Sequence, residues 1–342
     1  MEFIDFCMTE FETCFDGYLM ALEPLKLRLM NVPNFLFLCG GQTNTYKTGN
    51  GDERKYFSMR GAILDTILTD SKFRELSEKT QCAEDYQDWL EHGQVQNLID
   101  FELAIADMAG AIVLILEGPG AFAELGSFSV LDTLSEKLIL IVNTNIVEER
   151  TFINYGPIKY LEDNKKVVLK YQWDVRYIVN GINFDKVSSK ITSNQVETLV
   201  LAKRITNKIQ DNFIALSKES PKLDVNKIGH VCFIVGDLIY TFHSLRISEI
   251  KQALNDYFGV KSKYSLIKTC IYILDRFGFI KKVNNGDTYY IATSNNKGFL
   301  KHYYNAEFKE MSNIKNRNEF MQELMAGMVV YDEDRFASIT EN

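Results

Sequence analysis

The sequence predicts an α/β protein with a Rossmann-like parallel sheet in its first half and a C-terminal winged helix-turn-helix domain. Three observations lead to this prediction. Apolar runs alternate with helical patterns in the first half, and the second half carries two amphipathic helices followed by a basic hairpin. The chain has 342 residues, of which 46% are hydrophobic, and this is enough apolar material for two modest cores.

Short apolar runs and helical patterns follow one another through the first half. In chain order, we expect a strand over 34–41, helices over 58–70 and 96–110, a strand over 111–118, a helix over 122–135 and a strand over 137–143. Such alternation is typical of a parallel sheet, which binds ligands at the carboxyl ends of its strands. The glycine turns at 40–41 and 118–120 are therefore expected at the same edge of the sheet.

The second half begins with a long helical pattern over 194–216, which we expect to connect the two halves, and a linker sequence follows at 220–224. Amphipathic helices are predicted over 244–258 and 263–279. An Asn-Asn-Gly-Asp turn within 279–292 predicts a β-hairpin. Two helices followed by a hairpin are the elements of a winged helix.

Charge is unevenly distributed along the chain. The net charge is −8, but residues 246–301 hold ten Lys and Arg against four Asp and Glu, so this segment carries +6 and the remainder −14. A basic module on an acidic body indicates nucleic-acid binding, with Lys263, Lys268, Lys281 and Lys282 as candidate phosphate ligands. The alternative is that these lysines are only the solvated faces of the helices and the hairpin.

The cysteines and the amino-terminal sequence exclude several classes of protein. Six cysteines without regular spacing and four scattered histidines indicate neither a zinc site nor a disulfide framework, which favours a reducing cytoplasm. No window reaches about 18 uninterrupted apolar residues, and the first residues are acidic where a signal peptide would be basic. We therefore expect a soluble, cytoplasmic protein that does not bind a membrane.

A single acid follows the second glycine turn, in the stretch "LILEGPGAFAELGSF" at 114–128. Glycines after a strand let a phosphate approach the backbone, and the amides of the next helix favour negative charge. We expect Glu124 in the first turn of that helix, where the helix dipole would keep it ionised and direct it into the cleft. The alternative is that Glu124 only stabilises the start of the helix.

Several stretches together resemble a known family: "FLFLCGG", "SMRGAIL", the helix carrying Glu102, "EGPGAFAELGSF" and "RTFINYGPIKYL". Their order resembles that in the nucleoside deoxyribosyltransferase-like effector proteins of bacterial retrons, which also carry a C-terminal winged helix. The resemblance covers about residues 33–162 by motif and 237–301 by pattern. It implies an N-glycosidase toxin in antiviral defence. The implied partners are a reverse transcriptase and its RNA-linked single-stranded DNA (msDNA), and a higher-order assembly is left open.

The resemblance also implies roles for individual residues. Glu124 matches the glutamate that acts as nucleophile, Glu102 matches an acid that contacts the sugar, and Arg60 matches an arginine that could meet a phosphate. The remaining substrate-binding candidates are the glycines of the two turns: Gly40, Gly41, Gly118 and Gly120.

Other interpretations of these acidic and basic residues stay open. Glu102 could be a solvated helix residue, and Arg60 could pair with Asp65 or Glu53. Members of the resembling family carry acids where this chain has residues 84–85, Glu84 and Asp85, but the loose spacing there favours a solvated loop.

One departure from the family pattern bears on the substrate. Deoxyribosyltransferases usually carry an aspartate a few residues before the nucleophile, where this chain has Gly118, with Glu117 one place further back. This departure argues against base exchange but not against cleavage of a glycosidic bond by one carboxylate. Nicotinamide is cationic on its ribose and departs neutral, so Glu124 alone could suffice. NAD is therefore the expected substrate, and no cofactor is expected.

Two alternatives to NAD cleavage remain. The first is an N-glycosidase acting on a deoxynucleotide or nucleoside, and the second is a non-catalytic nucleotide-sensing DNA-binding repressor. Five segments are expected: an N-terminal helical segment (1–32), the deoxyribosyltransferase-like domain (33–165), a helical connector (166–236), the winged helix (237–298) and a C-terminal helical tail (299–342).

Overall fold

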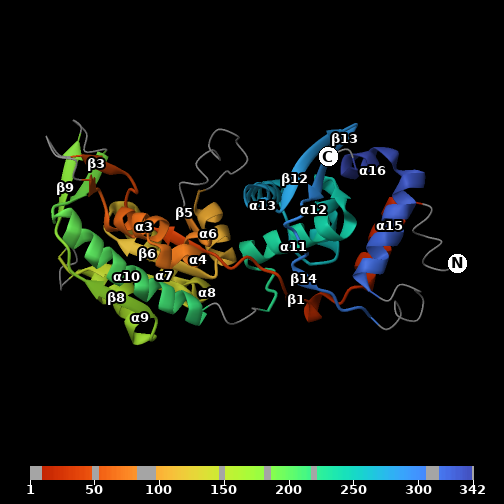
Figure 1. Ribbon diagram of the computed structural model, residues 1–342. Helices are drawn as coiled ribbons and strands as arrows, with labels where there is room; N and C mark the ends of the chain where they lie inside the picture. The colour runs from red at the N-terminus through yellow and green to blue at the C-terminus, as the bar shows by residue number, and fades with distance from the viewer. Residues whose placement is uncertain are drawn as a thin grey trace. The chain divides into compact units, whose positions relative to one another are not determined.

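The computed structural model describes residues 10–47, 54–82, 98–145, 151–180, 186–216, 222–305 and 316–340. The chain forms two compact units, whose elements are labelled in Figure 1. Unit 1 comprises Met1–Val32, Asp88–Met108 and Ser220–Asn342, and unit 2 comprises Pro33–Gln87 and Ala109–Glu219. Each unit is therefore assembled from stretches that are distant in sequence.

Unit 2 is built on a five-stranded sheet in which every neighbouring pair of strands is parallel. Its order is β5-β2-β6-β7-β8, and the strands are β2 (Leu36–Cys39), β5 (Thr80–Cys82), β6 (Ala111–Leu116), β7 (Leu138–Asn143) and β8 (Val167–Tyr171). The sheet confirms the predicted α/β class. All residues of β6 and β7 are buried, which explains why both are apolar up to the buried Asn143 at the end of β7.

The core of unit 2 joins the sheet to helices α3 (Met59–Thr69) and α10 (Gln195–Leu216), which run side by side in Figure 1. Side chains alternate between the faces of a strand, so one residue in two along each strand enters this core. In β2, β6 and β7 those residues are Leu36, Leu38, Ala111, Val113, Ile115, Ile139 and Ile141, and Cys82 of β5 joins them. The sequence predicts α10 as a connector, whereas the structure places it in unit 2, because its apolar stripe completes this core.

The helix expected over 122–135 is two helices, α7 (Pro119–Val130) and α8 (Asp132–Ser135). They are separated at Leu131, whose backbone is extended, and α7 packs against β6. The remaining elements of unit 2 are the single turns η2 (Ser71–Phe73), α4 (Arg74–Ser77), η4 (Asn154–Ile158) and α9 (Lys159–Asp163), and two hairpins, β3 (Thr45–Lys47) with β4 (Arg54–Tyr56) and β9 (Val175–Asn180) with β10 (Lys186–Ile191).

Unit 1 is arranged around α11 (Ile228–Phe242), which is buried along nearly its whole length. Helix α11 packs against α6 (Leu98–Met108) and α13 (Tyr264–Arg276). The other elements that follow are β11 (Ser244–Leu245), α12 (Ile247–Asp256), β12 (Ile280–Asn285) and β13 (Asp287–Ala292). The three strands form an antiparallel sheet of order β11-β13-β12, and the predicted hairpin turns at Gly286, whose φ is 66°.

The ends of the chain also belong to unit 1. They contain α2 (Phe11–Ala21), η1 (Pro24–Lys26), β1 (Arg28–Leu29), β14 (Leu300–Lys301), α15 (Arg317–Tyr331) and α16 (Glu333–Thr340), and β1 pairs with β14. The ring of Tyr18 on α2 stacks on Phe320 of α15 with centroids 4.0 Å apart, and its hydroxyl contacts His302 Nδ1 at 2.6 Å. These contacts hold the N-terminal segment against the C-terminal tail.

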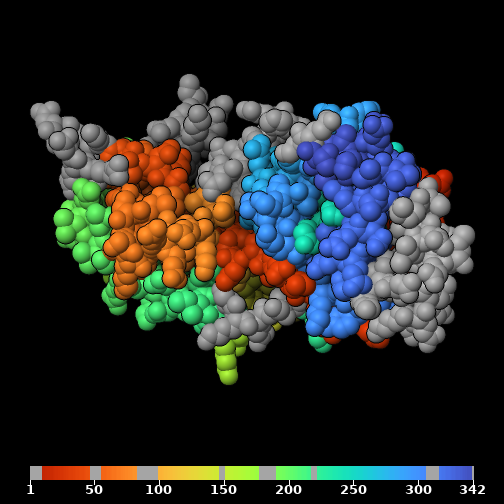
Figure 2. Space-filling model, turned by 45° about the vertical axis from the view of Figure 1, so that its right-hand side comes forward, coloured from red at the N-terminus to blue at the C-terminus, as the bar shows by residue number. Residues whose placement is uncertain are grey.

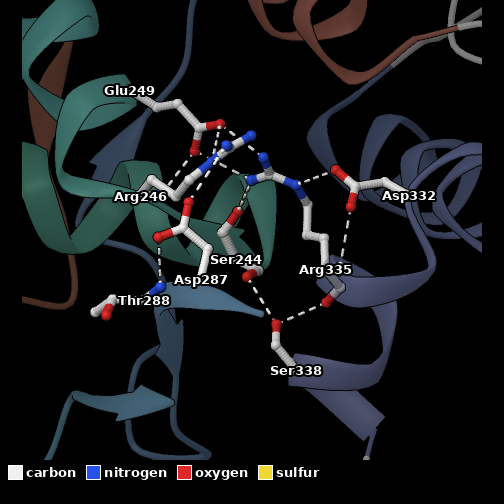
Figure 3. Close-up of polar contacts among 8 residues, drawn as sticks. All are labelled: Ser244, Arg246, Glu249, Asp287, Thr288, Asp332, Arg335 and Ser338. Atoms are coloured by element: carbon white, nitrogen blue, oxygen red, sulfur yellow. Dashed lines mark hydrogen bonds and ion pairs between the residues drawn. The ribbon is translucent and has the colours of Figure 1, made fainter. Parts of the chain in front are cut away.

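A buried arginine fixes α16 to the rest of unit 1 (Figure 3). The Arg335 side chain is fully buried and donates to Glu249 Oε1 at 2.6 Å, to Asp332 Oδ2 at 2.8 Å and to the carbonyl oxygen of Ser244 at 2.6 Å. Its guanidinium carbon lies 3.5 Å from the centroid of the Phe11 ring. In Figure 2 the C-terminal residues, in dark blue, lie beside the lighter blue of the hairpin, and α16 contacts both of its strands.

Candidate functional site

The first glycine turn follows β2 and is shaped by contacts within unit 2. Gly40 has a φ of 141°, and a Cβ atom there would lie 2.9 Å from the carbonyl oxygen of Ile115. A Cβ atom on Gly41 would lie 2.8 Å from Ser58 Cβ and 3.1 Å from Glu117 Oε1. Both positions therefore require glycine because neighbouring protein atoms approach the backbone closely.

The neighbour of this turn is Glu117, which directly follows β6 and is fully buried. Its carboxylate accepts the backbone N–H groups of Met59 at 2.8 Å and Arg60 at 3.0 Å, the first two residues of α3. Burial raises the pKa of the Glu117 carboxyl to about 7, against the lowering effect of hydrogen bonds from Arg60, Met59, Ser58 and Gly41. Glu117 therefore occupies the positive end of the α3 dipole.

The sequence did not predict that Glu117 would accept the first amides of α3, and it pointed to Glu117 only as the neighbour of Gly118. A signal was present, because an acid directly after a fully apolar strand lies at the ligand-binding edge of a parallel sheet. The amides at the start of α3 are already satisfied by this carboxylate. A phosphate at the first glycine turn would have to compete with it.

Arg60 is also buried, at 1% exposure, and lies beneath the first turn. Its Nη1 atom donates to the carbonyl oxygens of Gly41 at 3.2 Å and Gly40 at 3.4 Å. Asp65, one of the partners considered from the sequence, accepts a hydrogen bond from the hydroxyl of Tyr56 at 2.5 Å. The other, Glu53, lies outside the described residues. The guanidinium thus holds the turn, and contact with a phosphate stays a prediction.

The second glycine turn is open. Gly118 is the N-cap of α7, and neither Gly118 nor Gly120 would bring a Cβ atom within 4 Å of another residue. Helix α7 begins at Pro119 rather than at 122, so Glu124 is its sixth residue and lies in the second turn. The expectation of Glu124 in the first turn was wrong. Proline at the first helical position and a glycine N-cap start the helix earlier than the apolar pattern indicates.

The second candidate acid, Glu102, is a half-buried residue of α6, which belongs to unit 1, whereas Glu124 belongs to unit 2. A role at the sugar stays a prediction for Glu102. Glu84 and Asp85 lie outside the described residues.

Two cavities accompany the sheet and α7 within unit 2. A cavity of 380 Å³ lies beyond the carboxyl end of β8 and is lined by Met59, Gln172, Trp173, Asp174, Ser193, Glu197, Thr198 and Leu201. A second cavity, of 480 Å³, lies between α7 and the "FINYGP" stretch, and its lining includes Val130, Phe152 and Tyr155. Glu124 lines neither of these two cavities.

The four candidate nucleic-acid-binding lysines all lie in unit 1. Lys263 is the N-cap of α13 and Lys268 lies within that helix, and both side chains are exposed. Lys281 and Lys282 are neighbours on β12, so their side chains point to opposite faces of the hairpin. Lys282 is exposed and Lys281 is half-buried. The four lysines therefore cannot all share one face.

Within the described ranges, no group of His, Cys, Asp and Glu side chains could hold a metal ion. No helix in the part of the chain that the structure describes is long and apolar enough to cross a membrane.

Comparison with known proteins identifies the family. The profile of the STM3845 retron effector protein matches residues 56–282, which is more than half of the chain. The chain belongs to this retron effector family.

Two relatives of the effector are from Escherichia coli. It is 28% identical over 244 residues to the "Retron Ec73 putative ribosyltransferase/DNA-binding protein", a match covering 68% of this chain and 70% of the relative. It is 32% identical over 142 residues to the "Retron Ec86 putative ribosyltransferase/DNA-binding protein", covering 41% of each chain. The resemblance stated from the sequence motifs is thereby confirmed at the level of the retron effector family.

Proposed function

We propose that this retron effector is an N-glycosidase that cleaves the nicotinamide–ribose bond of NAD in unit 2. Nucleic acid held by a winged helix in unit 1 controls this activity. The carrying observation is the open amino terminus of α7 at the carboxyl edge of the sheet, with Glu124 one turn further along the helix. The printed names of the relatives, which include ribosyltransferase, support the same chemistry.

The pyrophosphate of NAD is assigned to α7 rather than shared between both turns. At α3, the carboxylate of Glu117 already accepts the amides of Met59 and Arg60. At α7, the N-cap is a glycine, which has no side chain to cap the helix, and the space beside Gly118 and Gly120 is open. The amides of the first helical turn and the helix dipole favour an anion there. The proposed role of the first turn is then structural: Gly40, Gly41 and Arg60 stabilise the backbone at this edge of the sheet.

Glu124 is the proposed catalytic residue. Its carboxylate would hold or trap the oxocarbenium-like ribose as the C–N bond breaks, with the bonding electrons leaving on the nicotinamide nitrogen. Nicotinamide, cationic in NAD, departs neutral without a proton. Water then adds to the ribose carbon and loses a proton, leaving ADP-ribose. One carboxylate therefore suffices, consistent with Gly118 standing where deoxyribosyltransferases carry a second acid.

The proposed winged helix comprises α11, β11, α12, α13, β12 and β13 in that order. Helices α12 and α13 pack together, and the hairpin joins β11 in one sheet, which is the element order of that fold. The proposed partners are the retron's reverse transcriptase and its RNA-linked single-stranded DNA. The basic residues of segment 246–301 support a nucleic-acid partner.

Base release is the direct test. The protein, assembled with its reverse transcriptase and nucleic acid, is incubated with NAD or with each deoxynucleotide separately, and released base is separated by chromatography. We expect nicotinamide from NAD with the wild-type protein and with Glu136→Gln, an exposed glutamate at the end of α8, but not with Glu124→Gln. If nucleobase is released from a deoxynucleotide while NAD stays intact, the deoxynucleotide is the substrate instead of NAD. No release from any of them would favour the repressor.

A further inference from the structure

An exposed aromatic ring lies in the middle of the basic segment. Tyr264 is the first residue of α13, and its side chain is 47% exposed. The ammonium of Lys251, from α12, lies 4.1 Å from the centroid of its ring. Lys268 follows one turn later on the same side of α13, and its side chain is exposed. Tyr264 is thus a surface ring in contact with one ammonium group, and a second exposed lysine lies one turn along the same helix.

A cavity of 320 Å³ lies at the start of α13, lined by residues on either side of Tyr264 in the sequence. Its lining includes the exposed lysines Lys261 and Lys263 and the side chains of Ser265 and Thr269. The side chain of Lys263, the N-cap of this 13-residue helix, makes no capping hydrogen bond to the first amides of α13. One acid, Asp100, also lines the cavity, leaving two positive charges against one negative. The cavity suits one phosphate group.

The tip of the hairpin offers a less favourable place for phosphate. Asn285 donates to the carbonyl oxygen of Asp334 at 2.9 Å, and a Cβ atom on Gly286 would lie 3.1 Å from Asp334 Oδ2. Glu333 and Asp334 form the acidic first turn of α16, and Asp287 adds a further acid at the tip itself. Negative charge therefore surrounds the wing tip, and nucleic acid is directed to α13.

We infer that Tyr264, Lys251, Lys261, Lys263 and Lys268 form a binding site for single-stranded nucleic acid, in which an unpaired base stacks on the Tyr264 ring. We call these five residues the Tyr264 face. The cavity at the start of α13 holds a phosphate of the same strand. This inference rests on the proposed nucleic-acid role of unit 1 and specifies its residues and the form of its ligand.

The preference for a single strand follows from the chemistry of the ring. In a duplex, the faces of the bases are covered by their stacked neighbours, whereas an unpaired base can lie flat on an aromatic side chain. Lysines alone would bind either form through its phosphates. An aromatic ring among lysines therefore adds affinity for a single strand, because the base faces of a duplex are not available for stacking on the ring.

Binding of labelled oligonucleotides to the full-length protein tests the inference. The probes are a single-stranded DNA of about 12 nucleotides, the duplex of the same sequence, and the same strand with its bases removed. Tyr264→Ala should weaken binding of the intact single strand about tenfold and leave the duplex and the abasic strand within about twofold. Tyr264→Phe keeps the ring and should bind as the wild type does.

Salt dependence separates stacking from charge. Tyr264→Ala should leave the slope of log affinity against log salt unchanged, whereas Lys263→Ala should reduce it by about 0.7 for a single strand. Lys208→Ala, an exposed lysine of α10 in unit 2, is the matched control and should change neither quantity. An equal loss for intact and abasic strands with Tyr264→Ala would overturn the stacking site. If the wild-type protein bound none of the probes, the proposed nucleic-acid role itself would fail.

Discussion

Replacing Glu117 by glutamine should remove a pH dependence of stability that the wild-type protein carries in unit 2. The Glu117 side chain is fully buried, and its carboxylate accepts the N–H groups of Met59 and Arg60. Burial raises the pKa of this carboxyl from its ordinary value of 4.5 to about 7, although the hydrogen bonds favour the charged form. Glutamine has a similar shape and cannot ionise.

The sign of the effect follows from the direction of the shift. Because the pKa in the folded state lies above that in the unfolded state, the folded protein binds more protons between the two values. The stabilising contribution is therefore complete below about pH 4.5 and is lost as the pH rises through about 7. A difference of 2.5 between the pKa values of 7 and 4.5 corresponds to about 3 kcal/mol.

The assay is urea unfolding followed by tryptophan fluorescence, at several values between about pH 5 and about pH 8. Over this range the wild-type free energy of unfolding should fall by up to about 3 kcal/mol more than that of Glu117→Gln. Glu136→Gln, at the exposed C-cap of α8, should follow the wild-type profile. Parallel profiles for the wild type and Glu117→Gln would refute the reasoning, since they would mean that Glu117 does not titrate in this window.

Three further substitutions test other parts of the structure. Arg335→Ala should lower the free energy of unfolding, measured by urea titration, by about 3 to 5 kcal/mol, because Glu249 and Asp332 lose their buried partner. A loss below about 1 kcal/mol would contradict this. Gly40→Ala should lower the free energy of unfolding by more than about 1 kcal/mol, because Gly40 has a φ of 141° and an added Cβ atom would lie 2.9 Å from the carbonyl oxygen of Ile115. Gly126→Ala, at an open position in α7, is the control and should leave the free energy of unfolding unchanged or raise it. Glu124→Gln should slow base release at least about tenfold, or about 1.4 kcal/mol in barrier, with an unchanged circular dichroism spectrum; full activity would remove Glu124 from the chemistry.

The architecture of unit 2 is largely determined by the sequence itself. Strands β6 and β7 are covered on both faces, so all their residues are apolar except the hydrogen-bonded Asn143 at the end of β7, and this leaves a continuous signal in the chain. The amphipathic stripes of α12 and α13 and the glycine in the hairpin turn are local signals of the same kind. Segments 58–70 and 194–216 likewise carry the apolar spacing of helices, and they form α3 and α10.

Positions along the helices were less predictable than the helices themselves. Glu124 was expected in the first turn of its helix, but Gly118 and Pro119 begin α7 earlier and place this acid in the second turn. Apolar periodicity defines the buried face of a helix and says little about where its first turn starts.

Only the tertiary structure decided which distant groups meet. The carboxylate of Glu117 reaches amides 58 and 57 residues earlier in the chain, at the start of α3. Arg335 reaches Glu249, 86 residues earlier, and α16 brings its acids to the tip of the hairpin. Periodicity and spacing describe neighbours along one helix or strand, whereas these contacts depend on how separate elements pack. The sequence alone therefore identified three of the five strands of the sheet, β2, β6 and β7, several of the helices and the glycine turns. Packing determined which charged groups occupy the helix ends and the hairpin tip.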